Sequence, residues 1–368
     1  HGAAPGGFGI GHRWTRQSGQ KRRWATIQGS LPVQDAGGVV ATVVVCGAVN
    51  WDTTCFVDHL PSPGEEVVCH HVSEVSGGTG ANTAVAAARI LGPGQVSFLG
   101  ALGNDRIAKK QIAILQSEAV ATNFIVRLRR HGSGQAYILV DRTGQNVIAS
   151  DLGANAAMEA RHVTASRLQR LLCECRCAVL TDPPIGVAKT VLRAAAATRI
   201  PALWDPGVIA QQGWDTLAPL TSSVDSLVLN ETEARQLFGT EAPDAILRRL
   251  DLRGAPVCIV LKRGSRGSTL LECTTGNIAY IPPLPMDDLG LTVVNTVGCG
   301  DVFLGAYAAG LARQLERPEA LAAATAAAGL NATSEQTRGG PTQELLQNTL
   351  RDARSLGFAI TTADGSNL

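Results

Sequence analysis

Short β-branched, apolar runs alternate with helical segments along most of this chain. Residues 42–46 read TVVVC, a run typical of a strand that is buried on both faces. Alternation of such runs with helices indicates a parallel sheet covered by helices on both sides, with right-handed crossovers. We therefore predict an α/β fold with a doubly wound, mainly parallel central sheet. The other strands of this sheet are expected at 96–100, 178–181, 201–204, 227–229 and 257–261.

A second group of strand-like segments interrupts that rhythm. Segments 53–57 and 67–72, together with a hairpin over 136–149, predict a small antiparallel lid attached to the main sheet. The lid would occupy roughly 53–75 and 123–150 of a domain that spans 41–355, followed by a tail at 356–368. Helices are expected at 81–91, 105–117, 300–315, 318–333 and 342–353.

The charge and aromatic content exclude some partners. The 32 basic and 31 acidic residues leave a net charge of +1, so no overall field attracts nucleic acid or a membrane surface. Aromatic residues make up 4% of the 368, too few for a platform on which single-stranded bases stack. Polar residues or glycine interrupt each apolar run before the roughly 18 residues that a membrane span needs. We expect neither a nucleic-acid partner nor a membrane span.

Cysteine usage favours an intracellular compartment. The chain has nine cysteines, an odd number and a low density for a disulfide-rich scaffold, so free thiols are the simpler interpretation. Cys173, Cys175 and Cys177 form a C-x-C-x-C cluster. Metal binding there is one interpretation, but structural zinc sites usually show two separated C-x-x-C pairs. Packing near a helix end is the favoured alternative.

The first 40 residues differ from the rest of the chain. They are rich in Gly and Gln, with Asp35 as their one acidic residue. Such a basic, acid-poor segment resembles part of an organelle transit peptide, which makes the location cytoplasmic or mitochondrial. An unstructured extension, a tag remnant or an arm that binds a partner in a larger assembly are the alternatives. The basic residues are Arg13, Arg16, Lys21, Arg22 and Arg23.

The segment 295–301, NTVGCGD, carries the clearest chemical signal. It precedes an Ala/Gly-rich helix, and the small residues at 298–300 leave backbone N–H groups exposed at the positive end of the helix dipole. This arrangement predicts an anion hole. An acid at its rim, Asp301, opposes static phosphate binding but suits a base that accepts a proton from a hydroxyl attacking the phosphate. Phosphoryl transfer and a plain helix N-cap both remain open on these residues alone.

The same segment resembles the carboxy-terminal signature D-T-x-G-x-G-D of the ribokinase-like (PfkB) family of carbohydrate kinases. Five further family motifs occur in the family's order, and the six matches lie within residues 42–340. Each is common alone, but the ordered set is specific. The five are GAVNWD at 47–52, SGGTGANTAVA at 76–86, GND at 103–105, NETE at 230–233 and GSRG at 264–267.

The resemblance implies an ATP- and Mg²⁺-dependent kinase of a small sugar, most favourably ribose. It makes Asp301 the catalytic base and gives the amides of Gly298, Cys299 and Gly300 to the migrating phosphoryl group. The sugar-binding residues that it implies are Asn50, Asp52, Gly77, Gly78, Thr79, Asn82 and Gln145, with Gln145 where many ribokinases place an acid.

The resemblance also implies a nucleotide site. It places Glu233 near magnesium, through water, and Asn230 beside the phosphates. Magnesium keeps most of its waters in proteins, which agrees with an indirect contact. The remaining nucleotide-binding residues are Lys262, Gly264, Gly267 and either Thr325 or Asn331.

Two departures from the family pattern motivate alternatives. Asn295 stands where the family has an Asp beside a monovalent cation, and an amide binds a cation less well than a carboxylate, so potassium activation is in doubt. Thr79 stands where ribokinases have Lys. A catalytically reduced accessory subunit of a larger organellar assembly, and a kinase of a nucleoside or another sugar, are therefore kept as alternatives. A homodimer through the lid strands is expected by resemblance.

Overall fold

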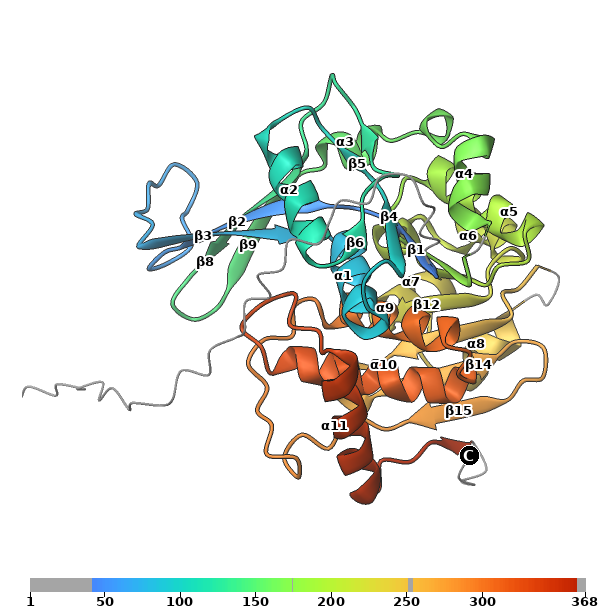
Figure 1. Cartoon of the computed structure of the whole chain (residues 1–368). Coiled ribbons are helices and arrows are strands. Elements are labelled where there is room, and N and C mark those ends of the chain that lie inside the picture. The colour runs from blue at the N-terminus through green and yellow to red at the C-terminus, as the bar shows by residue number, and fades with distance from the viewer. Residues whose placement is uncertain (1–41, 174, 251–253, 363–368) are drawn as a thin grey trace, which may run out of the picture. The chain divides into compact units, whose positions relative to one another are not determined.

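A ten-stranded sheet lies at the centre of the structure, a computed structural model that describes residues 42–173, 175–250 and 254–362 (Figure 1). In chain order its strands are β1 (Val43–Gly47), β4 (Val96–Leu99), β6 (Val120–Ala121), β10 (Cys177–Thr181), β11 (Ala202–Asp205), β12 (Ser226–Asn230), β13 (Cys258–Lys262), β14 (Ser268–Glu272), β15 (Ile278–Ile281) and β16 (Thr361–Thr362). In space the order is β16-β15-β14-β13-β12-β11-β10-β1-β4-β6. Neighbours from β6 to β13 are parallel, which confirms the predicted parallel sheet.

Helices cover both faces of this sheet. Those expected from the sequence form close to their predicted bounds. The helices are α1 (Thr79–Leu91), α2 (Arg106–Ser117), α3 (Gly153–Ala157), α4 (Ala165–Leu172), α5 (Ile185–Ala197), α6 (Trp214–Thr221), α7 (Glu231–Phe238), α8 (Pro243–Arg249), α9 (Cys299–Ala312), α10 (Arg317–Ala332) and α11 (Gln343–Ser355), with 3-10 turns at Ala160–His162, Gly207–Gln212 and Gly264–Arg266.

Alternate residues of each central strand enter two separate cores. In β1, Val43 and Val45 pack with α1, α9 and α10, whereas Val44 and Cys46 pack with α4 to α8 on the other face. All four side chains are buried, as the β-branched run predicts. The first face is unusually rich in alanine and glycine, because α1, α9 and α10 lie close against one another.

The lid is a second sheet, with the order β3-β2-β8-β9. It projects from the main body at the left of Figure 1. The predicted antiparallel arrangement is wrong in one respect: β2 and β8 run parallel, while β2–β3 and β8–β9 are antiparallel. The strand expected at 67–72 also lies later in the chain. The strands are β2 (Asn50–Phe56), β3 (His71–Gly77), β8 (Gly134–Val140) and β9 (Asn146–Asp151), and a separate short pair joins β5 (Ala101–Leu102) to β7 (Val126–Arg127).

The carboxy-terminal part of the sheet was not predicted. Strands β14, β15 and β16 add three antiparallel pairs beyond β13. Phe358 and Ile360 are buried in the main core, so the described part of the predicted tail belongs to the domain. The predictions for residues 1–40 lie outside the described residues. Within the described ranges, no helix is long and apolar enough to span a membrane.

The order of the strands reverses between β1 and β10, which are parallel neighbours. From β1 the chain proceeds outward to β4 and β6, then returns to β10 and continues outward on the other side. Crossover connections leave opposite faces at such a point and open a crevice at the carboxyl ends of the strands. The topology thus places a binding site beside Gly47 and Thr181, the last residues of β1 and β10.

The close approach of α1 and α9 requires a residue without a side chain at Gly305, and a substitution can test this requirement. A Cβ atom on Gly305 would lie 2.5 Å from the carbonyl oxygen of Thr83, whereas one on Gly186 in α5 would meet nothing within 4 Å. We expect Gly305→Ala to lower the free energy of unfolding by roughly 1–3 kcal/mol because α9 must shift. Gly186→Ala should raise it by roughly 0.5–1 kcal/mol. Urea unfolding of both variants tests this; equal effects would contradict the packing.

Candidate active site

Polar side chains gather where the central strands end. Asp205, Asn230 and Lys262 are the last residues of β11, β12 and β13, and Asp182 directly follows β10. The carboxyl ends of parallel strands meet at one edge of the sheet, so these groups face one region. The amino terminus of α9 enters the same region with Asp301 in its first turn.

Gly298 shapes the entry to α9. It has φ = 79°, a left-handed conformation that favours glycine, and a side chain there would overlap the carbonyl group of Thr337. The Cys299 N–H donates to the carbonyl oxygen of Thr296 at 3.3 Å, so one of the three predicted amides is already engaged in the turn. N–H groups of a first helical turn have no intrahelical partner, and Gly300 is exposed. The amide of Gly300 is therefore open to an anion.

Asp301 is held by an amide. Asn82 Nδ2 donates to Asp301 Oδ2 at 2.8 Å. Burial raises the pKa of Asp301 to about 7, although the bond from Asn82 and the positive charge of Lys262 lower it. A carboxyl group with a pKa near neutrality suits a general base, because it can both accept and release a proton at physiological pH.

Lys262 is the cation of the site. Its ammonium group pairs with Asp205, and a Cβ atom on Gly300 would lie 3.6 Å from its Nζ. Burial alone lowers the pKa of Lys262, but Asp205 and then Glu233 outweigh that effect and the net pKa is raised. Lys262 is therefore charged and lies beside the amino terminus of α9, as a group that stabilises an anion must.

Asp52 and Asn50 lie at the junction of lid and sheet. The Asp52 carboxylate lies directly against Gly77, where a side chain would overlap it. Burial raises the pKa of Asp52 to about 6, partly offset by the charge of Arg338. Asn155 Nδ2 donates to Asn50 Oδ1 at 2.8 Å and fixes the amide of Asn50. A carboxylate and an amide can each form hydrogen bonds with hydroxyl groups, as the predicted sugar site requires.

Sequence reasoning missed Asp182. The Thr79 hydroxyl donates to Asp182 Oδ2 at 2.9 Å, which brings the carboxylate beside the glycine-rich start of α1. Asp182 has φ = 52°, an unusual conformation for a non-glycine residue that often marks functional sites. Burial raises its pKa, and the charge of Asp205 adds to that rise. The available signal was an acid directly after the predicted strand 178–181.

Gln145 does not reach the site. The lid register pairs Asn50 with Gly134 at the near end and Phe56 with Val140 at the far end. Gln145 lies in the turn beyond that far end, is exposed, and donates its N–H to Asp141 Oδ1 at 3.0 Å. A contact with sugar would require a different placement of this turn, so the structure does not bring this predicted residue to the others.

The N-x-x-E motif forms a capping box. Asn230 Oδ1 accepts from the Glu233 N–H at 2.9 Å, and Glu233 Oε2 accepts from the Asn230 N–H at 2.8 Å. Asn230 therefore acts as a helix cap, whereas Glu233 is largely removed from water: burial raises its pKa to about 7, with a further rise from Asp205. Within the described ranges, no three His, Cys, Asp or Glu residues form a metal cluster.

A cavity of about 550 Å³ adjoins the amino terminus of α9. Its polar end carries the amides at the start of the helix, and apolar side chains such as Leu284, Met286 and Phe303 form much of its wall. Asn331 is not among its lining residues; its Nδ2 donates to the carbonyl oxygen of Val297 at 3.2 Å instead. Predicted site residues that line it are Lys262, Gly264, Gly267, Cys299, Gly300 and Thr325.

Two other predicted positions have local roles. Asn295 Oδ1 accepts from the Val297 N–H at 2.9 Å, which organises the loop before α9. In the cysteine cluster Cys173 is exposed, whereas Cys175 and Cys177 are buried. Burial raises the pKa of Cys175 to about 11, so it is a protonated, packed thiol.

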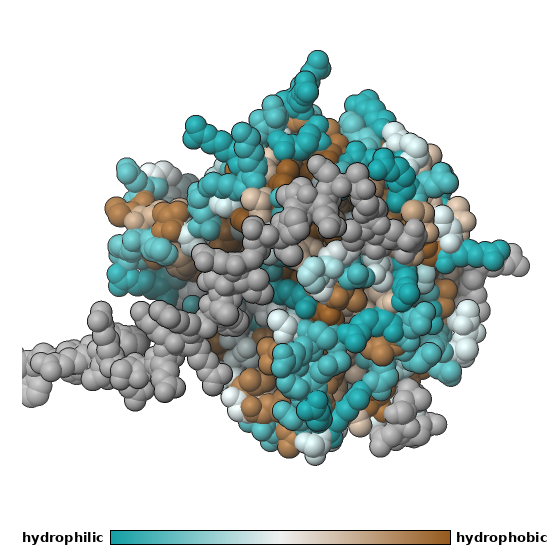
Figure 2. Space-filling view, viewed as in Figure 1, coloured by the Kyte–Doolittle hydropathy of each residue, from teal (hydrophilic) through white to brown (hydrophobic). Residues whose placement is uncertain are grey.

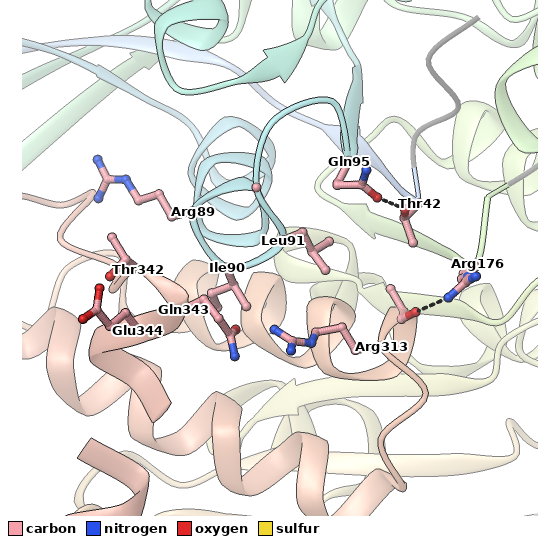
Figure 3. A pocket seen from close by; sticks show the side chains of 12 residues that line it. Thr42, Arg89, Ile90, Leu91, Gln95, Arg176, Arg313, Thr342, Gln343 and Glu344 are labelled. Atoms are coloured by element: carbon pink, nitrogen blue, oxygen red, sulfur yellow. Dashed lines mark hydrogen bonds between the residues drawn. The ribbon is translucent and has the colours of Figure 1, made fainter. Parts of the chain in front are cut away.

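A second cavity, of about 870 Å³, opens at the opposite edge of the sheet (Figure 3). Thr42 and Gln95 line it just before β1 and β4 begin, and Arg89 and Arg313 point into it from α1 and the end of α9. None of the predicted site residues lines this cavity. Of these two cavities, the smaller one at the amino terminus of α9 is therefore the one that predicted site residues line.

The raised pKa of Asp301 predicts a pH-dependent stability. Between about pH 4 and pH 7 the folded protein keeps Asp301 protonated while the unfolded chain releases that proton, so stability falls as pH rises. Asp301→Asn removes this loss. We expect its free energy of unfolding relative to wild type to increase from pH 5 to pH 7, by at most about 1.4 kcal/mol per pH unit. Calorimetry with Asp352→Asn, an exposed carboxylate, is the control; parallel curves for Asp301→Asn would disprove the burial effect.

Comparison with known proteins agrees with this geometry. The family model described as pfkB family carbohydrate kinase matches residues 40–344. The chain is 27% identical to a ribokinase of Haemophilus influenzae over 301 residues, which covers 80% of this chain and 93% of that protein. It is also 30% identical over 280 residues to a bifunctional ribokinase/ribose-5-phosphate isomerase A of Fructilactobacillus sanfranciscensis, covering 74% of this chain and 48% of that longer protein.

Among solved structures, a ribokinase of Arabidopsis thaliana complexed with ribose and ATP superposes with a TM-score of 0.77 at 25% identity. That match covers 85% of this chain and 99% of the plant protein. The match of the family model extends from before β1 into α11 and so includes every element that contributes to the site. This chain belongs to the pfkB family of carbohydrate kinases.

Proposed function

We propose that this protein transfers the terminal phosphoryl group of ATP to a hydroxyl group of a small sugar, with ribose as the best acceptor. The observation that carries the proposal is the position of Asp301 beside the open amide of Gly300 and the charged Lys262. A base, an anion-binding amide and a cation at one point are the groups that phosphoryl transfer needs.

The acceptor binds in the crevice between lid and sheet, where Asp52, Asn50 and Asp182 accept and donate hydrogen bonds to its hydroxyls. Asp301 accepts the proton of the attacking hydroxyl. A bond then forms between that oxygen and the γ-phosphorus while the bond to the β-phosphate oxygen breaks, and ADP leaves. Lys262 and the amides at the start of α9 stabilise the charge on the phosphoryl oxygens. Closure of the lid excludes water from the crevice.

Magnesium would arrive with the nucleotide. The residues fit this role through water, because Glu233 is a partly buried carboxylate that lies near Lys262 and Asp205 and uses Oε2 for the bond from the Asn230 N–H. Phosphate oxygens and water would supply the other ligands, as is usual for this ion. We do not expect strong activation by potassium, because the amide of Asn295 already serves the loop before α9.

Ribose is favoured over a nucleoside because curated relatives of this chain are named ribokinases. The complete base, cation and amide arrangement favours an enzyme over a catalytically reduced accessory subunit. A partner that binds through residues 1–40 stays a separate proposal, independent of this site.

We also propose that the lid pairs with the lid of a second copy. Apolar side chains are exposed on it, and Figure 2 shows hydrophobic atoms over the lid at the left. Strands β3 and β9 are the edges of the lid sheet and are open to pairing. The exposed apolar residues of the lid strands are Phe56, Val72, Val75, Tyr137, Val147 and Ile148.

A coupled ADP-release assay across pentoses, hexoses and nucleosides tests the function. We expect turnover with ribose to exceed that with the other acceptors, and Asp301→Asn to reduce kcat by about 10²–10⁴-fold because the general base is lost. Asp352→Asn, on the exposed side of α11, should act as wild type. A folded wild-type protein that is inert on the whole panel would favour the accessory-subunit alternative.

Lys262→Met tests the cation separately from catalysis. Without the ammonium group, Asp205 and Asp301 present unopposed negative charge to the nucleotide phosphates. We expect the affinity for ATP to fall at least about tenfold, or about 1.4 kcal/mol, by calorimetric titration without sugar. Arg266→Met removes an exposed cation that pairs with Glu231 nearby and should leave the affinity unchanged. Unchanged binding by Lys262→Met would remove this residue from the proposed site.

A further inference from the structure

Arg338 is a partly buried cation of the site that none of the sequence motifs includes. It lies in the loop between α10 and α11 and reaches the start of α1. Its Nε donates to Asn82 Oδ1 at 2.7 Å, and its Nη2 donates to the carbonyl oxygen of Gly77 at 3.2 Å. Its Nη1 is buried and has no hydrogen-bond partner within the described residues. The guanidinium group thus spans the junction between lid strand β3 and helix α1.

The bond from Arg338 fixes which way the Asn82 amide faces. A side-chain amide has an acceptor oxygen and a donor nitrogen, and only the nitrogen can bind a carboxylate. Asn82 directs its nitrogen to Asp301 and its oxygen to Arg338. Since a guanidinium group offers only donors, it selects this orientation and disfavours the reversed one, in which the amide oxygen would face the carboxylate.

A second arginine, Arg89, holds the backbone of the loop that carries Arg338. Arg89 Nη1 donates to the carbonyl oxygens of Arg338 and Gly340, at 2.5 and 3.1 Å. The same guanidinium group forms two bonds to Glu118, at 2.7 and 2.9 Å. Arg89 lines the larger cavity, which none of the predicted site residues lines (Figure 3). It holds the backbone of Arg338 without occupying the acceptor crevice.

Removing the charged guanidinium group of Arg338 from water costs free energy, and no direct ion pair within the described ranges offsets this cost. Removal from water lowers the pKa of its guanidinium group to about 10. Among the described residues Arg338 forms no ion pair within 4.0 Å, in contrast to Arg89 and Arg317. A charged group that is removed from water without a direct counter-ion is not expected to stabilise the fold. A role in the active site accounts for Arg338 better than a stabilising role does.

We propose that Arg338 is a positioning residue for the proton acceptor: it orients Asn82, and Asn82 in turn holds and aims Asp301. This inference rests on the proposed role of Asp301 as base. The groups that face Asp301 from the surrounding elements are Asn82 of α1, Asp182 after β10, Asp205 of β11, Lys262 of β13, Cys299 of α9 and Arg338 itself.

The test measures the ionisation of Asp301 without requiring turnover. The protein is labelled with ¹³C at aspartate carboxyl carbons, and the signal that disappears in Asp301→Asn is followed against pH. We expect Arg338→Met and Arg338→Gln each to raise the pKa of Asp301 by about one unit, tenfold in the ionisation constant, because neither side chain offers donors alone and the Asn82 amide is no longer fixed. Arg317→Met, at a half-buried arginine paired with Asp225 away from the site, is the control and should leave it unchanged.

A double-variant cycle separates orientation from charge. If Arg338 acts through Asn82, then Arg338→Met added to Asn82→Ala should shift the pKa of Asp301 by less than half of its effect in the wild-type background. Fully additive shifts, a wild-type pKa in Arg338→Gln, or no shift in Arg338→Met would each overturn the proposal. Arg338→Gln keeps the test available if the methionine variant does not fold, because its amide can present either a donor or an acceptor to Asn82.

Turnover provides a second readout. On the best acceptor, the acid limb of the kcat profile should move to higher pH in both Arg338 variants by the same amount as the carbon signal, with KM for ATP unchanged. If the pKa from the ¹³C signal shifts but the acid limb of the kcat profile does not, Asp301 is positioned as proposed but is not the base. In that outcome the proposed function fails and the positioning role stands.

Discussion

The electrostatics of this site depend on one buried ammonium group. Lys262 interacts with the carboxylates of Asp182, Asp205, Glu233 and Asp301, which would otherwise repel one another in a region of low dielectric constant. Burying several like charges is tolerable only when an opposite charge lies among them. The same ammonium group lies beside the first turn of α9. Lys262 therefore offsets the repulsion among these carboxylates, and its positive charge can also attract a phosphate group.

Topology explains why groups so distant in sequence meet at this cation. Parallel strands all present their carboxyl ends at one edge, so Asp205, Asn230 and Lys262 arrive there from three successive β-strands. The reversal of strand order between β1 and β10 opens the crevice at that edge. Helix α9 then enters from the other end of the chain and brings Asp301. The buried strands keep their ends fixed, which a loop alone could not do.

The sequence was sufficient wherever a short segment determined its own geometry. The glycine turn before Asp301 follows from local backbone rules, and the β-branched runs follow from burial on two faces. Asp182 offered one local signal, as an acid directly after a predicted strand, but its role and that of Arg338 exist only through partners about a hundred or more residues away. Gln145 was misplaced since its position depends on the length and register of a lid strand, which periodicity does not determine.

Stability and chemistry oppose each other at Asp301. A fully solvated carboxylate would be more stable in its ionised form, but it would be a weak base with a pKa near 4. Burial raises the pKa of Asp301, and the hydrogen bond from Asn82 lowers it in part because it stabilises the charged form. The chain from Arg338 through Asn82 to Asp301 thus limits how far burial can raise the pKa. It leaves the pKa of the carboxyl group at about 7, a value that suits the proposed acceptance and release of a proton from a sugar hydroxyl.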